Sequence, residues 1–371
     1  MNQRWAWVEV DLDAIKHNVR TLKALTSKGT LFMAVVKADA YGHGVEPVAR
    51  AAAGAGADRF GVATVEEALE LKSVGLEEPI QLLSEPPPET IGLLLEHDII
   101  PAVTTREFIT ELSRVAAESG KKAKFHLKVD TGMNRIGVPT EDAVTFAAAL
   151  QAYPGLIHEG TFTHYATAET PADWDFQTQI ELFDKVLGQM RTEGVDPGIV
   201  HSANSAAAIL APQTHQQMIR CGISVYGLHP GESTYDRANL KPAMSVVGRV
   251  ALVKRIGLGD GVSYGLTWRA ASPTTIATLS LGYADGIHRV LSGEMDVLIG
   301  GVRCPQVGRV TMDQIMVEVP RGLNVSVGDE AVIVGTQGGE MISMDELAER
   351  AQTINYEMAC AFGMRMERTY I

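Results

Sequence analysis

The chain has 371 residues, a length that favours two domains over one. Hydrophobic residues make up 46 % and charged residues 21 %, which is the balance of an ordinary globular protein, and no apolar run is long enough to span a bilayer. The net charge of −13 argues against a nucleic-acid-binding surface, which needs clustered Lys and Arg. The three cysteines are scattered without CxxC spacing, so we expect neither a disulfide framework nor a bound metal. The N-terminus lacks the pattern of a signal peptide, and we therefore expect a cytoplasmic protein.

From Asp11 to about Tyr235, short apolar segments alternate with amphipathic helical stretches. The predicted strands are Leu31–Lys37, Arg59–Ala63, Ile80–Leu83, Ile99–Val103, Ala123–Val129, Leu156–Thr163, Ile199–His201 and Met218–Arg220. Eight strand–helix repeats fit a (β/α)₈ barrel of the TIM type, whose usual size is about 250 residues. A doubly wound open sheet is the competing architecture. Two capping-box patterns, Thr64-x-x-Glu67 and Thr104-x-x-Glu107, predict helix starts.

The pattern changes from about Met244 onward, where β-branched and alternating segments dominate. The predicted elements are strands at Ser245–Ile256, Thr275–Leu281, Val307–Val319 and Ala331–Val334, and one helix near Met344–Gln352. We therefore expect an α/β barrel domain at 11–238 and a mainly-β domain at 239–371, with the junction in Gly231–Lys241. Trp5–Val10 also alternates, and we expect residues 1–10 to join the β domain as a strand.

A lysine ends the first barrel strand, in the stretch AVVKADAYGHG that runs from Ala34 to Gly44. A lysine in such a position most often just leaves the core for solvent. At the carboxyl end of a barrel strand, however, Lys37 faces the catalytic mouth. An amine partly withdrawn from water loses its proton more readily, so it can attack an aldehyde and later act as a base. The GxG element that follows is weak evidence by itself.

This stretch closely resembles the cofactor-lysine signature of alanine racemases, and the resemblance extends along the whole chain. The further matching blocks are FHLKVDTGMNRIG (Phe125–Gly137), HSANS (within Val200–Ser205), RCGISVYG (Arg220–Gly227), VSYG (Val262–Gly265), LGYADG (Leu281–Gly286), VGRVTMDQ (Val307–Gln314) and TINYE (Thr353–Glu357). Eight blocks in order are far more specific than any one. The resemblance implies a barrel with a C-terminal mainly-β domain, and an isomerase dependent on pyridoxal 5′-phosphate. Such an enzyme interconverts L- and D-alanine and so supplies D-alanine, a peptidoglycan precursor.

The resemblance also implies the cofactor ligands. Lys37 would hold the cofactor covalently. The residues implied at its phosphate end are Tyr41, Asn204, Ser205, Gly222, Ile223 and Tyr356. Hydroxyls and backbone N–H groups at a strand-to-helix turn are what a phosphate needs. Our seventh and eighth predicted strands end just before Ser205 and Gly222, where barrels commonly build a phosphate site. Taken singly, each hydroxyl could be an ordinary loop residue.

Arg220 is similar to the family's arginine that faces the pyridine nitrogen. A guanidinium keeps its protons, so it donates a hydrogen bond to that nitrogen without protonating it. The ring is then a weaker electron sink, which favours return of the proton to Cα over transamination. The simpler alternative for Arg220 is a surface ion pair.

The resemblance implies two catalytic bases, with Lys37 exchanging the α-proton on the D face and Tyr264 on the L face. A free tyrosine has a pKa of ~10 and is protonated at neutral pH. To act as a base, Tyr264 therefore needs either a lowered pKa or a neighbour that relays its proton. His164, which would pack against Arg220, is the implied relay. A lone histidine at that position would more often be a core residue.

Two cationic residues complete the implied substrate side. Arg135 resembles the arginine that contacts the cofactor's phenolic oxygen and the substrate carboxylate. Lys128 aligns with a lysine that family members carry as a carbamate, and that modification would turn a repelling cation beside Arg135 into an anion that holds it. An unmodified Lys128 with a bound anion is the alternative.

The resemblance further implies a homodimer with shared active sites, in which Tyr264 and Met312 reach the barrel of the partner chain. Met312 would contact the substrate carboxylate through its backbone. Tyr283 and Tyr356 resemble a pair that narrows the entrance, with Asp313 in a supporting place. Tyr283 could equally be a core residue of the β domain.

Three alternatives remain open. A serine racemase or a broad-specificity racemase would keep both bases and differ in pocket size. Basic-amino-acid decarboxylases share the architecture, but their acidic substrate motifs are not apparent in the sequence. A non-catalytic vitamin B6 carrier would keep the cofactor lysine without a β domain, and it would have no use for Tyr264.

Overall fold

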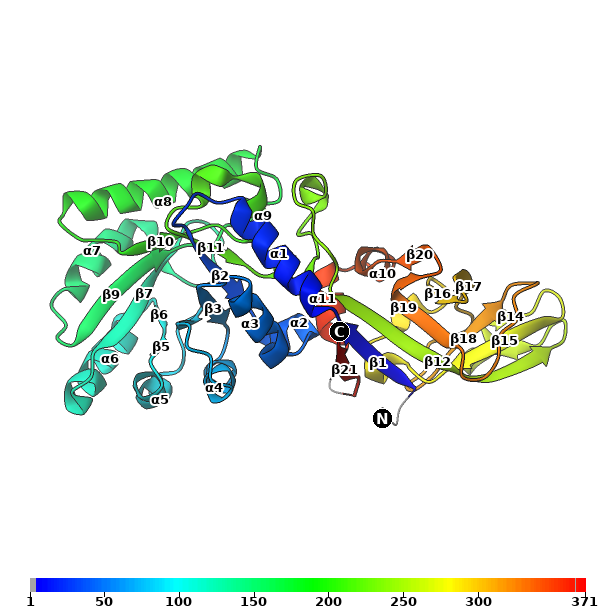
Figure 1. Cartoon of the computed structure of the whole chain (residues 1–371). Helices are drawn as coiled ribbons and strands as arrows, with labels where there is room; N and C mark the ends of the chain where they lie inside the picture. Colours follow the sequence, from blue (N-terminus) through cyan, green and yellow to red (C-terminus); the bar gives the residue numbers. More distant parts are fainter. Residues whose placement is uncertain (1–4, 364) are drawn as a thin grey trace. The chain divides into compact units, whose positions relative to one another are not determined.

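The computed structural model describes residues 5–363 and 365–371, and these fall into two compact units (Figure 1). The barrel unit consists of Asp13–Ala40 and Val45–Lys241. The β unit consists of the chain up to Leu12, Tyr41–Gly44 and Pro242–Ile371. No helix among the described residues is long and apolar enough to cross a membrane.

The barrel unit contains parallel strands at all eight predicted places and in the predicted order, with the fourth divided into two. They are β2 (Leu31–Val35), β3 (Arg59–Val62), β4 (Ile80–Leu82), β5 (Ile99–Ile100), β6 (Ala102–Val103), β7 (Ala123–Asp130), β9 (Leu156–Phe162), β10 (Ile199–His201) and β11 (Met218–Cys221), with the short β8 (Val138–Pro139) beside β7. The strand order is β11-β2-β3-β4-β5 in one sheet and β10-β9-β7-β6 in the other. This arrangement is the predicted (β/α)₈ barrel and excludes the doubly wound sheet.

A proline divides the fourth predicted strand, Ile99–Val103, into β5 and β6. Pro101 has no N–H to donate, so the ladder is interrupted there. β5 pairs with β4 and β6 pairs with β7, and Pro101 O accepts the amide of His126 at 3.0 Å. On the other side, the amide of Arg220 donates to Ala203 O at 2.9 Å. These bonds join the two sheets into a closed barrel.

Helices follow the strands around the barrel (Figure 1). They are α1 (Leu12–Ala24), α2 (Lys37–Gly42), α3 (Val45–Gly54), α4 (Val65–Ser73), α5 (Ile91–Glu96), α6 (Arg106–Ser119), α7 (Thr140–Leu150), α8 (Trp174–Thr192) and α9 (Ser205–Leu210). Phe32 on β2, Phe60 on β3 and Phe108 on α6 are among the fully buried side chains that fill the core.

The two capping predictions have different outcomes. The Thr64 capping box is confirmed, because the Thr64 side chain accepts the Glu67 amide and Glu67 reaches back to the cap backbone. The Thr104 box is wrong. The cap of α6 is Thr105, whose hydroxyl accepts the Phe108 amide at 3.2 Å. The amide of Thr104 instead donates to the carboxylate of Glu85 at 2.5 Å, a partner that lies too far along the chain for a local pattern to reveal.

The β unit is built on a strand ladder in the order β17-β16-β19-β12-β1-β21. Its strands are β1 (Ala6–Val10), β12 (Met244–Ile256), β13 (Gly261–Val262), β14 (Trp268–Arg269), β15 (Thr274–Leu279), β16 (Asp296–Ile299), β17 (Val302–Pro305), β18 (Ile315–Val319), β19 (Glu330–Gln337), β20 (Glu340–Ile342) and β21 (Glu367–Tyr370). β1 lies between β12, antiparallel, and β21, parallel. The N-terminal strand therefore belongs to the β ladder.

Three details of the β unit differ from the predicted elements. The segment Val307–Val319 is a strand only from Ile315 onward, and its earlier half is a loop. The hairpin of β16 and β17 was not predicted, nor was the helix α11 (Asn355–Ala361) that follows α10 (Met344–Arg350). These elements are short, and their apolar positions are too few to set a period.

Candidate active site

The turn that carries Lys37 has an unusual backbone. β2 ends at Val35, and Lys37 is the first residue of α2, where the next four residues have φ of 52–53°. Each non-glycine residue in this left-handed conformation costs roughly 1–2 kcal/mol. Such strain persists only where surrounding contacts enforce it, and it is concentrated at functional sites. The predicted strand end at Lys37 is thus replaced by a left-handed helical turn.

Hydrogen bonds in the barrel unit hold the start of this turn. The amide of Ala38 donates to Glu67 Oε1 at 2.7 Å, and the amide of Ala40 donates to Val36 O at 2.9 Å. The Asp39 carboxylate accepts the amide of Val45, the first residue of α3, at 2.8 Å. The capping-box glutamate of α4 therefore also fixes the turn that follows Lys37.

Four basic side chains, Lys37, Lys128, Arg135 and Arg220, gather near His164. Lys128 is buried on β7, and its ammonium group donates to Leu83 O at 3.2 Å. Burial, with smaller contributions from Arg220, Arg135 and Lys37, lowers the pKa of Lys128 to about 7. Burial and the same group of cations also hold the pKa of His164 well below its usual value. A concentration of positive charge with a neutral histidine beside it is suited to a small anionic molecule.

Arg220 is the fully enclosed member of this group. Its Nη2 atom donates to Thr163 O at 2.8 Å and to Ser202 O at 3.1 Å, and it lies 3.2 Å from His164 Nδ1. Its Nη1 atom lies 3.1 Å from His201 Nδ1. Burial lowers the pKa of Arg220 to about 10, so the guanidinium remains charged at neutral pH. Both Nη atoms are engaged, and because Arg220 is buried among carbonyls and imidazoles, the alternative of a surface ion pair is wrong.

The turn after β11 has the features of a phosphate cradle. The amide of Gly222 donates to Ser205 Oγ at 2.9 Å, which joins the ends of β10 and β11. Asn204 caps α9 by accepting the Ala207 amide at 3.0 Å. The 3₁₀ helix Ile223–Tyr226 starts at Gly222 without a side-chain cap. Among the described residues, the buried Ser224 hydroxyl has no hydrogen-bond partner. N–H groups and hydroxyls of this kind fit the phosphate of pyridoxal 5′-phosphate.

The predicted site residues of the β unit form a second group. Tyr41 is buried, and its ring centroid lies 6.2 Å from that of Tyr356 on α11. A Cβ atom at Gly42, where φ is 79°, would lie 2.5 Å from Ala359 O, so only glycine fits there. The left-handed turn and α11 thus bring the two tyrosine rings together.

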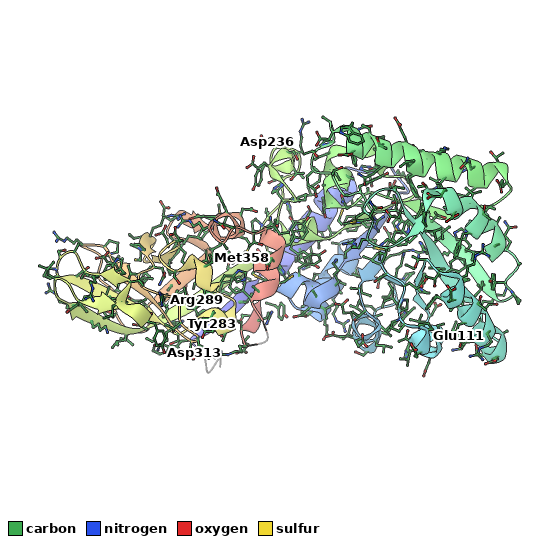
Figure 2. All side chains as sticks on the ribbon, turned by 180° about the vertical axis from the view of Figure 1, so that it is seen from behind. Glu111, Asp236, Tyr283, Arg289, Asp313 and Met358 are labelled. Atoms are coloured by element: carbon green, nitrogen blue, oxygen red, sulfur yellow. The ribbon has the colours of Figure 1, made fainter. Side chains whose placement is uncertain are left out.

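Other predicted residues of the β unit project from its surface. Tyr264 is 72 % exposed, Met312 is 52 % exposed and Tyr283 is 43 % exposed. The amide of Tyr283 donates to Thr311 O at 2.9 Å, so the loops of Tyr283 and Met312 are held side by side. Figure 2 shows Tyr283 near Asp313, whose carboxylate accepts Arg365 Nη2 at 2.7 Å. The interpretation of Tyr283 as a core residue is wrong.

The backbone at Tyr264 is also constrained. Ser263 and Leu266 have φ of 64° and 47°, and Ser263 Oγ donates to Arg309 O at 2.7 Å. A short turn with two strained residues therefore fixes the backbone that carries the exposed Tyr264 side chain.

Sequence reasoning missed His126, His201 and Glu159, which connect to Arg220 inside the barrel. His126 Nδ1 lies 2.7 Å from His201 Nε2, and its Nε2 lies 3.1 Å from Glu159 Oε2. The available signal was the presence of two histidines in otherwise apolar strand segments. Both lie in the matching blocks FHLKVDTGMNRIG and HSANS, but the resemblance gives neither of them a role, and their 75-residue separation hides the pairing.

Comparison with known proteins identifies the family. The model of the alanine racemase N-terminal domain matches residues 10–230, and that of the C-terminal domain matches residues 243–370. The alanine racemase of Symbiobacterium thermophilum is 45 % identical over 99 % of this chain and 97 % of its own length. Alanine racemase from Bacillus anthracis, solved with bound L-Ala-P, has a TM-score of 0.94 and 39 % identity, and the match covers 100 % of this chain and 96 % of that one. A histidine racemase from Leuconostoc mesenteroides has a TM-score of 0.92 and 32 % identity, with 100 % and 99 % covered. This chain belongs to the alanine racemase family.

Proposed function

We propose that this chain interconverts L-alanine and D-alanine with pyridoxal 5′-phosphate held on Lys37. The observation that supports this most directly is the enclosed Arg220, whose Nη atoms are both engaged and whose neighbours include the Ser205–Gly222 turn. Family membership supplies the reaction. When bound, the cofactor draws electrons from the substrate Cα and so makes its proton removable.

The protein residues then have separable tasks. Ser205, Gly222 and Ile223, with Tyr41 and Tyr356, bind the phosphate through hydroxyls and N–H groups. Arg220 donates its Nε–H toward the ring nitrogen and keeps its own proton, because a guanidinium stays charged.

The two bases are proposed to differ in their supporting residues. Lys37 moves the α-proton on the D face. The Tyr264 hydroxyl moves it on the L face, assisted by His164. Because the His164 imidazole is neutral and its Nδ1 atom accepts from Arg220, its Nε2–H is the donor left for the Tyr264 oxygen.

Lys128 is proposed to be a carbamate in the working enzyme. A carbamate forms when a neutral amine attacks CO₂ and releases a proton, and the lowered pKa of Lys128, about 7, leaves a large fraction of the amine neutral at physiological pH. The resulting anion would pair with Arg135, which itself would hold the substrate carboxylate and the phenolic oxygen of the cofactor.

We also propose a homodimer with two shared sites, and domain boundaries at 11–238 and 239–371, with residues 1–10 in the β domain. The exposed Tyr264 and Met312 support the dimer, because a base that is 72 % exposed has no enclosed environment in its own unit. Two-fold symmetry would make both sites equivalent and close the assembly at two chains. Asp313 would hold the Met312 loop through Arg365.

The test of this function is incubation with L-alanine, L-serine and L-histidine separately, followed by chiral analysis of the products. Rapid formation of D-alanine, with much slower reaction of the other two, is the expected result. Histidine is included because a related scaffold carries a histidine racemase. Borohydride reduction should then fix a pyridoxyl group on Lys37. A label on another lysine, or a preference for serine or histidine, would contradict the proposal.

A further inference from the structure

A line of polar side chains runs through the barrel unit behind Arg220. Arg220 Nη1 lies 3.1 Å from His201 Nδ1, His201 Nε2 lies 2.7 Å from His126 Nδ1, and His126 Nε2 lies 3.1 Å from Glu159 Oε2. Arg59, the first residue of β3, donates to the same carboxylate oxygen at 2.6 Å. This chain of hydrogen bonds thus runs from Arg59 at the start of β3 to Arg220 near the end of β11.

The chemistry of the end groups fixes the direction of every bond in this line. A guanidinium only donates, so His201 Nδ1 accepts and its proton lies on Nε2. His201 therefore donates to His126 Nδ1, and His126 in turn donates through Nε2 to Glu159. Each imidazole holds one tautomer, because the opposite tautomer would place two N–H groups against each other at one junction.

Burial agrees with this assignment. His126 and His201 are both 0 % exposed. Burial lowers the pKa of His126 and holds that of His201 well below its usual value, so both rings are neutral. Burial acts to raise the pKa of Glu159, but hydrogen bonds from His126 and Arg59 outweigh it and keep the carboxylate ionised. Lys124 lies 3.3 Å from its other oxygen.

The barrel core is shaped around the two rings. A Cβ atom at Gly160 would lie 2.5 Å from His126 Cε1, so the missing side chain makes room for this imidazole. The His201 ring stacks on Phe162 at a centroid distance of 4.8 Å and an interplanar angle of 4°. The Arg220 guanidinium lies 5.4 Å from the centroid of the same Phe162 ring. Packing therefore holds the ring planes of His126 and His201 in place, and the hydrogen bonds fix their tautomers.

We propose that Glu159, His126 and His201 are positioning residues for Arg220, acting as a one-directional hydrogen-bond relay that ties its guanidinium to a carboxylate. Among the described residues, Arg220 has no direct ion pair, and its partners are carbonyls and neutral imidazoles. The relay gives this buried cation an indirect counter-charge and fixes Nη1, so that Nε keeps its direction toward the ligand. The effect of this relay on catalysis rests on the proposed function, whereas the relay itself rests on the hydrogen bonds given above.

The first test is ¹⁵N NMR of the histidine rings in the labelled protein as purified, near neutral pH. His201 and His126 should both be neutral Nε2–H tautomers. Glu159→Gln keeps the shape of the acceptor and removes its charge, and it should shift the ring resonances of both histidines. An Nδ1–H tautomer or an imidazolium at His201, or an unchanged His201 spectrum in the Glu159→Gln variant, would overturn the proposal.

The second test compares variants by steady-state kinetics. His201→Leu removes the hydrogen bonds of the His201 ring to Arg220 and to His126. If Arg220 then moves by about 1 Å, kcat should fall on the order of 10²-fold, with little change in KM for alanine. His201→Gln offers one acceptor and one donor and should recover a large part of kcat. The matched control is His158→Leu, because His158 is a histidine of β9 that stacks on Phe125 and lies 3.0 Å from Thr161 Oγ1, and among the described residues it makes no hydrogen bond to the relay.

The outcomes separate this proposal from the proposed function. Equal losses in His201→Leu and His201→Gln, or the same loss in His158→Leu, would mean that His201 only fills space. If the wild-type protein fails to racemise alanine, the proposed function is wrong, and the NMR result still decides whether the relay exists.

Discussion

The barrel unit and the β unit present their site residues in opposite ways. In the barrel, Lys128 and Arg220 are buried, and their side chains are fixed by carbonyls, imidazoles and one aromatic ring. In the β unit, Tyr264 and Met312 project from strained or hydrogen-bonded loops, and more than half of each side chain is exposed. The barrel residues are thus held by contacts within their own unit, whereas in the β unit hydrogen bonds hold the backbone and leave the two side chains at the surface of that unit. Under the proposed function, the barrel residues that face the cofactor are placed by folding, and Tyr264 is the residue that depends on a partner chain.

The largest expected effect tests whether the two halves come from different chains. Lys37→Ala and Tyr264→Phe homodimers should each be severely impaired, because each lacks a base at both sites. When the two variants are dissociated, mixed and reassociated at random, half of the dimers are hybrids, and each hybrid has one intact site. Activity should return to roughly a quarter of the wild-type value, by counting sites under two-fold symmetry.

Subunit exchange in that experiment is checked by native mass spectrometry, with each variant alone taken through the same cycle as the control. Confirmed exchange without any recovered activity would mean that Lys37 and Tyr264 of one chain serve the same site. In that case the exposed Tyr264 would need another explanation.

The next effect distinguishes the two bases. In the Tyr264→Phe variant, α-proton exchange that starts from L-alanine should fall far more than exchange that starts from D-alanine. A general base contributes typically ~10²–10⁴-fold, so the asymmetry is measurable by solvent-deuterium incorporation. Tyr235→Phe is the control, since Tyr235 is an exposed tyrosine that the proposed site does not include. Equal losses from both enantiomers would argue for a single base.

The buried Lys128 predicts a pH dependence of stability in buffer free of CO₂. The pKa of Lys128 is about 7 in the folded chain and 10.5 in the unfolded chain, for which the reference value stands. Between these two pH values the unfolded chain therefore binds one more proton than the folded chain. The free energy of unfolding should therefore rise with pH through this window. Lys128→Met should remove this contribution, as measured by urea unfolding at a series of pH values.

The control for that measurement is Lys185→Met, which removes an exposed lysine of α8. It should leave the slope with pH unchanged. The same slope in the wild type and in Lys128→Met would mean that Lys128 is not neutral in the folded chain. Added bicarbonate should raise the wild-type free energy of unfolding if the amine becomes a carbamate, because the added group binds only the folded chain.

The smallest effect concerns the turn after Lys37. Ala38 is exposed and has φ of 53°, so Ala38→Gly should remove the steric cost of this conformation, roughly 1–2 kcal/mol. Part of that gain is lost because glycine gives up more conformational entropy on folding than alanine does. A net gain of up to about 1 kcal/mol is expected from thermal or urea unfolding. Ala53→Gly, in the right-handed helix α3, should instead destabilise by about 1 kcal/mol. Changes of the same sign in both variants would contradict the assigned strain.

The contrast between the units also describes what the sequence could predict. The barrel strands were predicted because their apolar runs and turn signals are local. Lys37 was singled out by its place at a strand end, and Arg220 and Tyr264 because the resemblance names them. The loop at Val307–Asp313 was predicted as a strand, since its β-branched residues alternate as in a strand. The true cap at Thr105 and the relay through His126 and His201 depend on partners distant in the chain, which no periodicity reports.

The left-handed turn at Ala38–Tyr41 was missed for a different reason. Most residues in it are ordinary helix formers, and neither glycine nor asparagine occupies its first positions. Intrinsic preference would predict a right-handed turn there. The conformation is imposed by surrounding bonds such as that between Ala38 and Glu67, so it appears only in the structure.

The handedness of that turn has a chemical consequence. A backbone with φ near +52° at residues 38–41 is the mirror image of an ordinary helical turn, and it is therefore the conformation that D-amino acids adopt without strain. A chain proposed to make D-alanine thus holds two L-alanines, Ala38 and Ala40, in the geometry natural to the opposite enantiomer. In a semisynthetic protein, D-alanine at position 38 should fit the turn better than either L-alanine or glycine, because it keeps a methyl group and removes its clash with the following carbonyl.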